Sequence, residues 1–129
     1  MSPVTVNLQF PTRWWTPLAA GEQPGISGRV MGESSCLSRI EWPNTPEFAG
    51  ANVIRAAYSD GLCLQTYSDM DQLPEPLRTN TVIEFVVGEL RRLFPEVSVP
   101  NPIGYPWSGN ASDYVGASFH IWCVPFPAP

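Results

Sequence analysis

Hydrophobic and polar residues alternate at the start of the chain and predict a strand there. The apolar residues of this strand are Val4, Val6, Leu8 and Phe10, separated by polar ones, which is the two-residue period of a half-buried strand. Turn residues and apolar runs predict further strands at Ile26–Glu33, Leu37–Trp42, Asn52–Ser59, Ile103–Trp107 and Ala117–Val124. In the strand at Asn52–Ser59, burial on both faces is indicated by the run Val53, Ile54, Ala56 and Ala57.

One segment has the period of an amphipathic helix. From Thr81 onward, one helical face carries Val82, Ile83, Val86, Val87, Leu90, Leu93 and Phe94. Thr79 or Asn80 is expected to cap the start and Pro95 to end the helix, with a shorter turn or helix just before it. Strands, helix and strands in this order predict one α+β domain over residues 1–129. We expect a mixed, mostly antiparallel sheet of about five or six strands, with one or two helices packed on one face.

Composition narrows the classes of function. The net charge is −5 and all seven basic residues are arginines, so nucleic acid and anionic membrane surfaces are not expected partners. The chain starts without a secretory signal pattern and contains no apolar run of membrane-spanning length. Three cysteines without CxxC spacing predict reduced thiols in a cytoplasmic protein that folds without a disulfide framework or a metal.

Several catalytic motifs are missing from the sequence. No two glycines are separated by a single residue, so a GxGxxG fingerprint cannot occur, and a chain without lysine cannot form a Walker motif. A single histidine and scattered cysteines do not give the usual ligand spacing of a zinc site. There is no GxSxG elbow of a serine hydrolase. We therefore expect no metal, and no cofactor bound by this chain alone.

Five stretches in order resemble a known family: VNLQFPTRWW, SRIEWPN, NVIRAAYSDG, LPEPLRTNTVIEFVVGELRRLFP and WSGNASDYVGASF. Together they cover most of residues 4–122 and resemble the substrate-binding domain of flavin-dependent amine oxidases, closest to the L-amino acid oxidase branch. The flavin-binding domain of that family lies outside this region, and Thr5 takes the position of the lysine that the family places near the flavin. The resemblance thus implies a domain that meets FAD only if a partner chain supplies it.

The resemblance and the residue chemistry together suggest site residues. His120 is the only histidine, the residue type whose unperturbed pKa lies near neutrality, which makes it the candidate general acid or base; the alternative is a histidine satisfied within the core. Trp42 takes the place of a substrate-contacting tyrosine of the L-amino acid oxidases, so it is either a pocket wall or a core aromatic. Arg39 could bind a carboxylate with two hydrogen bonds, or lie on a solvated strand face. The resemblance adds three substrate-binding candidates: Tyr114, Phe119 and Trp122.

The tryptophans suggest that the domain has a partner. Without a flavin domain, Trp14-Trp15, Trp107 and Trp122 are expected to leave apolar surface uncovered, and large exposed apolar patches are usually covered by another protein. We therefore expect a homo-oligomer, or a complex with an FAD-binding partner chain.

Three hypotheses about function follow. In the first, the domain binds an aromatic or amino-acid-derived metabolite and acts on it without flavin, by isomerisation, cyclisation or decarboxylation within a biosynthetic pathway. In the second, the chain is the substrate-binding subunit of a split FAD-dependent oxidase. In the third, it is a non-catalytic ligand-binding or interaction module. The first is slightly favoured, because the missing lysine speaks against flavin oxidation.

Overall fold

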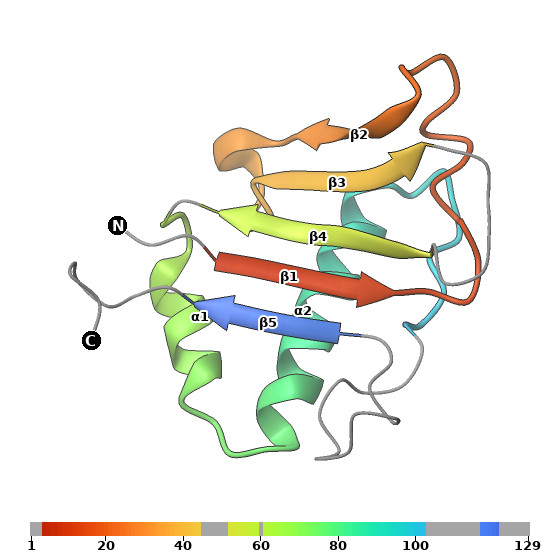
Figure 1. The fold of residues 1–129 in the computed structure, drawn as a ribbon. Helices are drawn as coiled ribbons and strands as arrows, with labels where there is room; N and C mark the ends of the chain where they lie inside the picture. Colours follow the sequence, from red (N-terminus) through yellow and green to blue (C-terminus); the bar gives the residue numbers. More distant parts are fainter. Residues whose placement is uncertain (1–3, 45–51, 60, 103–116, 122–129) are drawn as a thin grey trace.

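The computed structural model describes residues 4–44, 52–59 and 61–102, and the backbone of 117–121. These residues form an antiparallel sheet in the order β2-β3-β4-β1-β5, with both helices on one side of it (Figure 1). The α+β class with helices on one face is therefore confirmed. The elements are β1 Val4–Gln9, β2 Gly25–Val30, the 3-10 helix η1 Gly32–Ser34, β3 Arg39–Asn44, β4 Val53–Ser59, α1 Leu64–Asp71, α2 Leu77–Leu93 and β5 Ala117–Ile121. We call the side that meets the helices the inner face and the opposite side the outer face.

Some element boundaries differ from the sequence-based expectation. β2 stops at Val30, because the chain then turns through η1. β3 continues through Pro43 to Asn44 instead of ending at Trp42. The described part of β5 ends at Ile121, and residues 122–124 of the expected strand lie outside the described residues. The strand expected at 103–107 lies outside the described residues.

Helix α2 begins at Leu77, so Thr79 and Asn80 lie inside it and do not cap it. The carboxylate of Glu75, just before the helix, accepts hydrogen bonds from the Thr79 N–H (2.9 Å) and hydroxyl (2.7 Å). Burial raises the pKa of the Glu75 carboxyl, but the bonds from Thr79 and the nearby Arg78 outweigh it, and the pKa is lowered. A carboxylate thus occupies the donor-rich start of the helix, where negative charge is favourable.

The core lies between the inner face and the helices. The alternation in β1 places its apolar residues on the inner face as predicted, and Val4, Val6 and Leu8 are completely buried. The apolar stripe of α2 meets them with Val82, Val86, Val87 and Leu90, all buried. Burying these branched side chains removes apolar surface from water, which is the main stabilising contribution to such a fold.

The Trp14-Trp15 pair belongs to this core. Trp14 is 7% and Trp15 1% exposed, and the Trp15 indole N–H donates to the Pro43 carbonyl at 3.0 Å. The ring of Trp14 packs against Phe10 and Phe94, with centroid distances of 5.5 and 6.4 Å. The expectation that this pair leaves apolar surface uncovered is wrong, because the chain buries both rings by itself. Trp107 and Trp122 lie outside the described residues.

Strand β4 contains a β-bulge that its sequence pattern does not reveal. Val6 of β1 pairs with Ala57, but the next residue, Asn7, pairs with Arg55, so Ala56 has no partner in the register. The extra residue explains why Ala56 and Ala57 are both buried although they are consecutive. Val53 is 43% exposed, so the expectation that both faces of this strand are buried is wrong.

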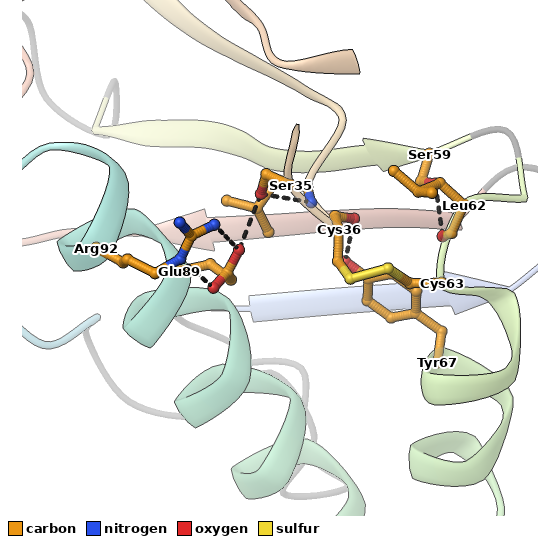
Figure 2. The surroundings of a disulfide bond; sticks show 9 residues. Ser35, Cys36, Ser59, Leu62, Cys63, Tyr67, Glu89 and Arg92 are labelled. Atoms are coloured by element: carbon orange, nitrogen blue, oxygen red, sulfur yellow. Dashed lines mark hydrogen bonds and ion pairs between the residues drawn. A yellow bond between two sulfur atoms is a disulfide. The ribbon is translucent and has the colours of Figure 1, made fainter. Parts of the chain in front are cut away.

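A disulfide joins Cys36, between η1 and β3, to Cys63 at the start of α1, with 5.5 Å between their Cα atoms (Figure 2). The prediction of reduced thiols is therefore wrong for these two residues. An odd cysteine count and the lack of a spacing motif carry no information on which residues the fold brings within bridging distance. Cys123 lies outside the described residues.

Hydrogen bonds fix both helices to the segment that carries Cys36 (Figure 2). The buried Tyr67 of α1 donates its hydroxyl to the Cys36 carbonyl at 2.8 Å, and burial raises the pKa of this hydroxyl, which keeps it a neutral donor. On α2, Glu89 accepts hydrogen bonds from the Ser35 hydroxyl (3.0 Å) and from Arg92 (2.8 Å). The bond from Arg92 lowers the pKa of the Glu89 carboxyl, burial opposes this, and the bond from Ser35 lowers it further.

The disulfide should contribute measurably to stability. It closes a loop over a sequence separation of 27 residues, which in the chain-entropy account corresponds to about 3–4 kcal/mol. We expect Cys36→Ser and Cys63→Ser each to lower the free energy of unfolding by about that amount, measured by urea denaturation. Cys123→Ser is the matched control and should not change it. Equal stability of the Cys36→Ser and control proteins would show that the bond does not constrain the chain.

Two glycines differ in whether the surrounding structure leaves room for a side chain. Gly28 in β2 passes so close to β3 that a Cβ on it would lie 1.8 Å from the Ile40 carbonyl oxygen. Gly88 lies inside α2, and a Cβ there would meet nothing within 4 Å among the described residues. Of these two glycines, Gly28 is therefore the one that packing requires.

Alanine at these two positions should change stability in opposite directions. Gly28→Ala is expected to lower the free energy of unfolding by about 1–3 kcal/mol, because β2 must move away from β3. Gly88→Ala is expected to raise it by up to about 1 kcal/mol, since alanine favours a helix interior over glycine. Thermal and urea denaturation measure both effects. A Gly28→Ala protein as stable as the wild type would contradict the close approach of the two strands.

Candidate ligand-binding face

The outer face of the sheet is the part of the molecule where functional side chains gather. Figure 1 shows no described element in front of this face. Its side chains are those between the buried positions of each strand, as in β1, where Thr5, Asn7 and Gln9 are half-buried. Polar and charged side chains on an open sheet face can meet a ligand or a partner, in contrast to those sealed against the helices.

An arginine–tyrosine cluster, formed by Arg39 and Glu41 of β3 with Arg55 and Tyr58 of β4, lies on this face. The guanidinium carbon of Arg39 lies 5.6 Å from the centroid of the Tyr58 ring, and that of Arg55 lies 5.3 Å from it. Arg55 also donates to the Glu41 carboxylate at 2.9 Å, across the one β3–β4 pair in the register. Both guanidinium groups are thus held by an aromatic ring, an arrangement favoured by cation–π attraction.

The bulge in β4 is what brings the cluster together. Arg55 and Tyr58 are three residues apart, and in a regular strand side chains at that spacing point to opposite faces. The extra residue at Ala56 restores the alternation, so both side chains lie on the outer face and contact each other. A feature of the backbone therefore decides the chemistry of this surface.

Arg39 differs from the other arginines in its partners. The others each have hydrogen bonds or ion pairs: Arg29 with Glu22, Arg55 with Glu41, Arg78 with Asp71, Arg92 with Glu89, Arg13 with Asn52 and Arg91 with the Val99 carbonyl. Over residues 4–44, 52–59 and 61–102, no such bond involves the exposed Arg39 side chain. Its guanidinium N–H groups can therefore receive a carboxylate with two parallel hydrogen bonds.

Two shallow hollows adjoin the cluster. One, of about 300 Å³, is bordered by Asn7, Pro43 and Arg55 among others, and the second, of about 270 Å³, by Gly28, Val30 and Arg39 among others. Ile26 and Glu41 border both hollows. Apolar side chains next to an arginine suit a ligand with an apolar body and an anionic group.

The register relates His120 to the cluster. Thr5 of β1 pairs with Tyr58 on one side and with His120 of β5 on the other. Because neighbouring strands lie roughly 4.8 Å apart, the backbone of His120 is about 10 Å from that of Tyr58, in the same row across the sheet. Of the predicted site residues, the structure thus brings Arg39 and His120 to the same end of the sheet. Thr5 lies between Tyr58 and His120 in this row.

Trp42 lies apart from Arg39. Its side chain points to the inner face, is 1% exposed and packs against Phe94 with a centroid distance of 6.0 Å. The indole N–H donates to the Glu22 carboxylate at 3.3 Å, and Arg29 lies over the ring at 5.4 Å. The two candidates are therefore on opposite faces, and the side chain of Trp42 has the surroundings of a core aromatic.

The remaining predicted site residues give less information. Phe119 of β5 pairs with Val6 of β1 in the backbone register. Tyr114 and Trp122 lie outside the described residues, so their substrate-binding role stays a prediction.

A groove of about 470 Å³ runs along α2 beside Gly88, with Asn80, Val87 and Arg91 among its lining residues. Arg91 is already bound there, donating to the Val99 carbonyl at 2.8 Å and to Asn101 at 3.1 Å. The arginine of this groove is therefore already occupied, in contrast to Arg39 on the outer face.

Sequence reasoning missed the roles of Tyr58 and Arg55. The one available signal is the alanine pair between them, which breaks the two-residue period of β4 and is compatible with a bulge. Arg39 is exposed on its strand, as the interpretation of a solvated strand face expected.

Comparison with known proteins adds no assignment: no protein-family model matches the chain, and neither a curated protein nor a solved structure shows significant similarity to it. The resemblance to flavin-dependent amine oxidases stays a prediction. Within the described residues, no helix is long and apolar enough to cross a membrane. The same part of the chain has no group of three or more acidic, histidine or cysteine side chains placed to hold a metal ion.

Proposed function

We propose that the domain binds an aromatic or amino-acid-derived metabolite with a carboxylate group on the outer face of its sheet. Arg39 would receive the carboxylate, and the apolar side chains of the hollows beside it would contact the body of the ligand. The observation that carries the proposal is an exposed arginine, oriented by Tyr58, with no anionic partner among the described residues of an acidic protein.

The proposal includes chemistry without flavin. His120, in the same row of the sheet as Tyr58, would serve as general acid or base for an isomerisation, cyclisation or decarboxylation. The chain itself would need no cofactor, since acid–base chemistry requires only a group that titrates near the working pH. In this scheme Arg39 binds and orients the ligand, and His120 moves the proton.

Arg39→Gln tests the binding role. We expect the wild-type protein to bind at least one of phenylpyruvate, L-phenylalanine and L-tryptophan, measured by isothermal titration calorimetry. The substitution should weaken that affinity by about tenfold to a hundredfold, which is the usual effect of losing hydrogen bonds between two charged groups. Arg78→Gln, which removes an arginine that pairs with Asp71 at the start of α2, is the matched control and should leave affinity unchanged. Failure of every probe to bind the wild type, or equal affinity of Arg39→Gln, would refute the proposal.

A second candidate function is the substrate-binding subunit of a split oxidase. It rests on the resemblance, which spans most of residues 4–122, while Thr5 in place of the family's lysine counts against it. Native mass spectrometry and an absorbance scan of the protein isolated from its own cells separate the two. A yellow complex with a second, FAD-bearing chain would support the split oxidase and refute the flavin-free proposal.

The disulfide provides evidence on the cellular compartment of the protein. Disulfides persist mainly in oxidising compartments, so the Cys36–Cys63 bond counts against the cytoplasmic location expected from the sequence. We propose that the chain functions where this bond is kept. Alkylation of the denatured protein from its own cells, without reductant, should modify one cysteine of the three. Modification of all three would restore the cytoplasmic expectation.

A further inference from the structure

Strand β2 forms one edge of the sheet and is unusual in what it exposes. Its neighbour on one side is β3, and no strand among the described residues pairs with its other side (Figure 1). Ile26 is 71% and Val30 77% exposed, and the strand carries no lysine or acidic residue. Natural edge strands usually carry charges or prolines that prevent pairing with another chain; β2 has no proline, and its one charged side chain, Arg29, is bound to Glu22.

The backbone of β2 has the groups that a further strand needs. In an antiparallel ladder only alternate residues direct their N–H and C=O groups toward the neighbour. The other set of β2 therefore faces away from β3. The Gly28 carbonyl accepts a bond from the Arg29 side chain at 3.0 Å, but a carbonyl oxygen has two lone pairs and can accept another.

We propose that β2 pairs antiparallel with β2 of a second copy of this chain, about a two-fold axis at Gly28. In this register Ile26 lies opposite Val30 of the other copy, so each exposed apolar side chain meets an apolar one. Arg29 lies opposite Ser27 of the other copy, and the two Arg29 side chains are not directly opposed. A register centred on Arg29 would place these like charges opposite each other, which is unfavourable.

The sequence of β2 is self-complementary about Gly28. Ile26 and Val30 are equally spaced from Gly28, and an isologous two-fold contact requires that kind of self-complementarity. The absence of a side chain at Gly28 also removes any clash at the axis. The pairing extends the sheet in its own plane and does not cover Arg39, although Ile26 and Val30 also border the hollows beside it. It does not depend on the proposed function.

Charge substitutions test the partner and the register together. We expect sedimentation equilibrium, from micromolar to millimolar protein, to show the wild type moving from a mass of 14.2 kDa to twice that value. Ile26→Lys/Val30→Lys should remain monomeric, because lysines then face each other across the axis. Ile26→Lys/Val30→Glu should dimerise again, because the introduced lysine faces the glutamate introduced in the other copy.

Val53→Lys is the matched control, since Val53 is exposed on the outer face but belongs to β4, which is paired on both sides. It should dimerise like the wild type, and unchanged thermal unfolding should show that all variants are folded. A wild type that stays monomeric, a lysine–glutamate variant that stays monomeric, or a Val53→Lys variant that loses the dimer would each overturn the proposal.

Discussion

One extra residue in β4 determines what each face of the sheet presents. With Ala56 left out of the pairing, Ile54, Ala56 and Ala57 all meet the core, while Arg55 and Tyr58 both reach the outer face. A regular strand would send one of the last two into the helices, where a charged or phenolic group would need a buried partner. The bulge therefore maintains an apolar inner face and also creates the cluster on the outer face.

The disulfide and the hydrogen bonds around it act on the opposite side of the sheet. They hold the turn between η1 and β3 against both helices, through Cys63 and Tyr67 of α1 and Glu89 of α2 (Figure 2). That turn leads directly into Arg39, the first residue of β3. The position of the arginine on the outer face thus depends on contacts made behind the sheet, and a rigid support of this kind favours ligand binding because little ordering remains to be done.

With the helices on one side, the outer face and the β2 edge are two surfaces of the described residues that remain open to interactions. The outer face offers an oriented arginine beside apolar hollows, and the β2 edge offers unpaired backbone groups and two exposed apolar side chains. These surfaces are adjacent, since Val30 of β2 pairs with Arg39 of β3. Ligand binding and strand pairing could therefore coexist in one assembly.

The sequence alone determined the α+β class, the buried face of β1 and the apolar stripe of α2. Local periodicity reports these directly, because burial repeats every two residues in a strand and every 3.6 in a helix. It also indicated that Arg39 could lie on a solvated strand face. The ends of β2 and β3 were less predictable, because the turn at η1 and the pairing of Pro43 with Ile26 depend on neighbouring strands.

Only the tertiary structure decided the contacts between distant segments. The Cys36–Cys63 bond, the core position of Trp14 and Trp42, and the contact of Arg39 with Tyr58 each join residues from different elements. No local pattern encodes such pairs, since they follow from how the whole sheet and the helices pack. The bulge at Ala56 belongs with them, because an unpaired residue is defined by the register of the neighbouring strand.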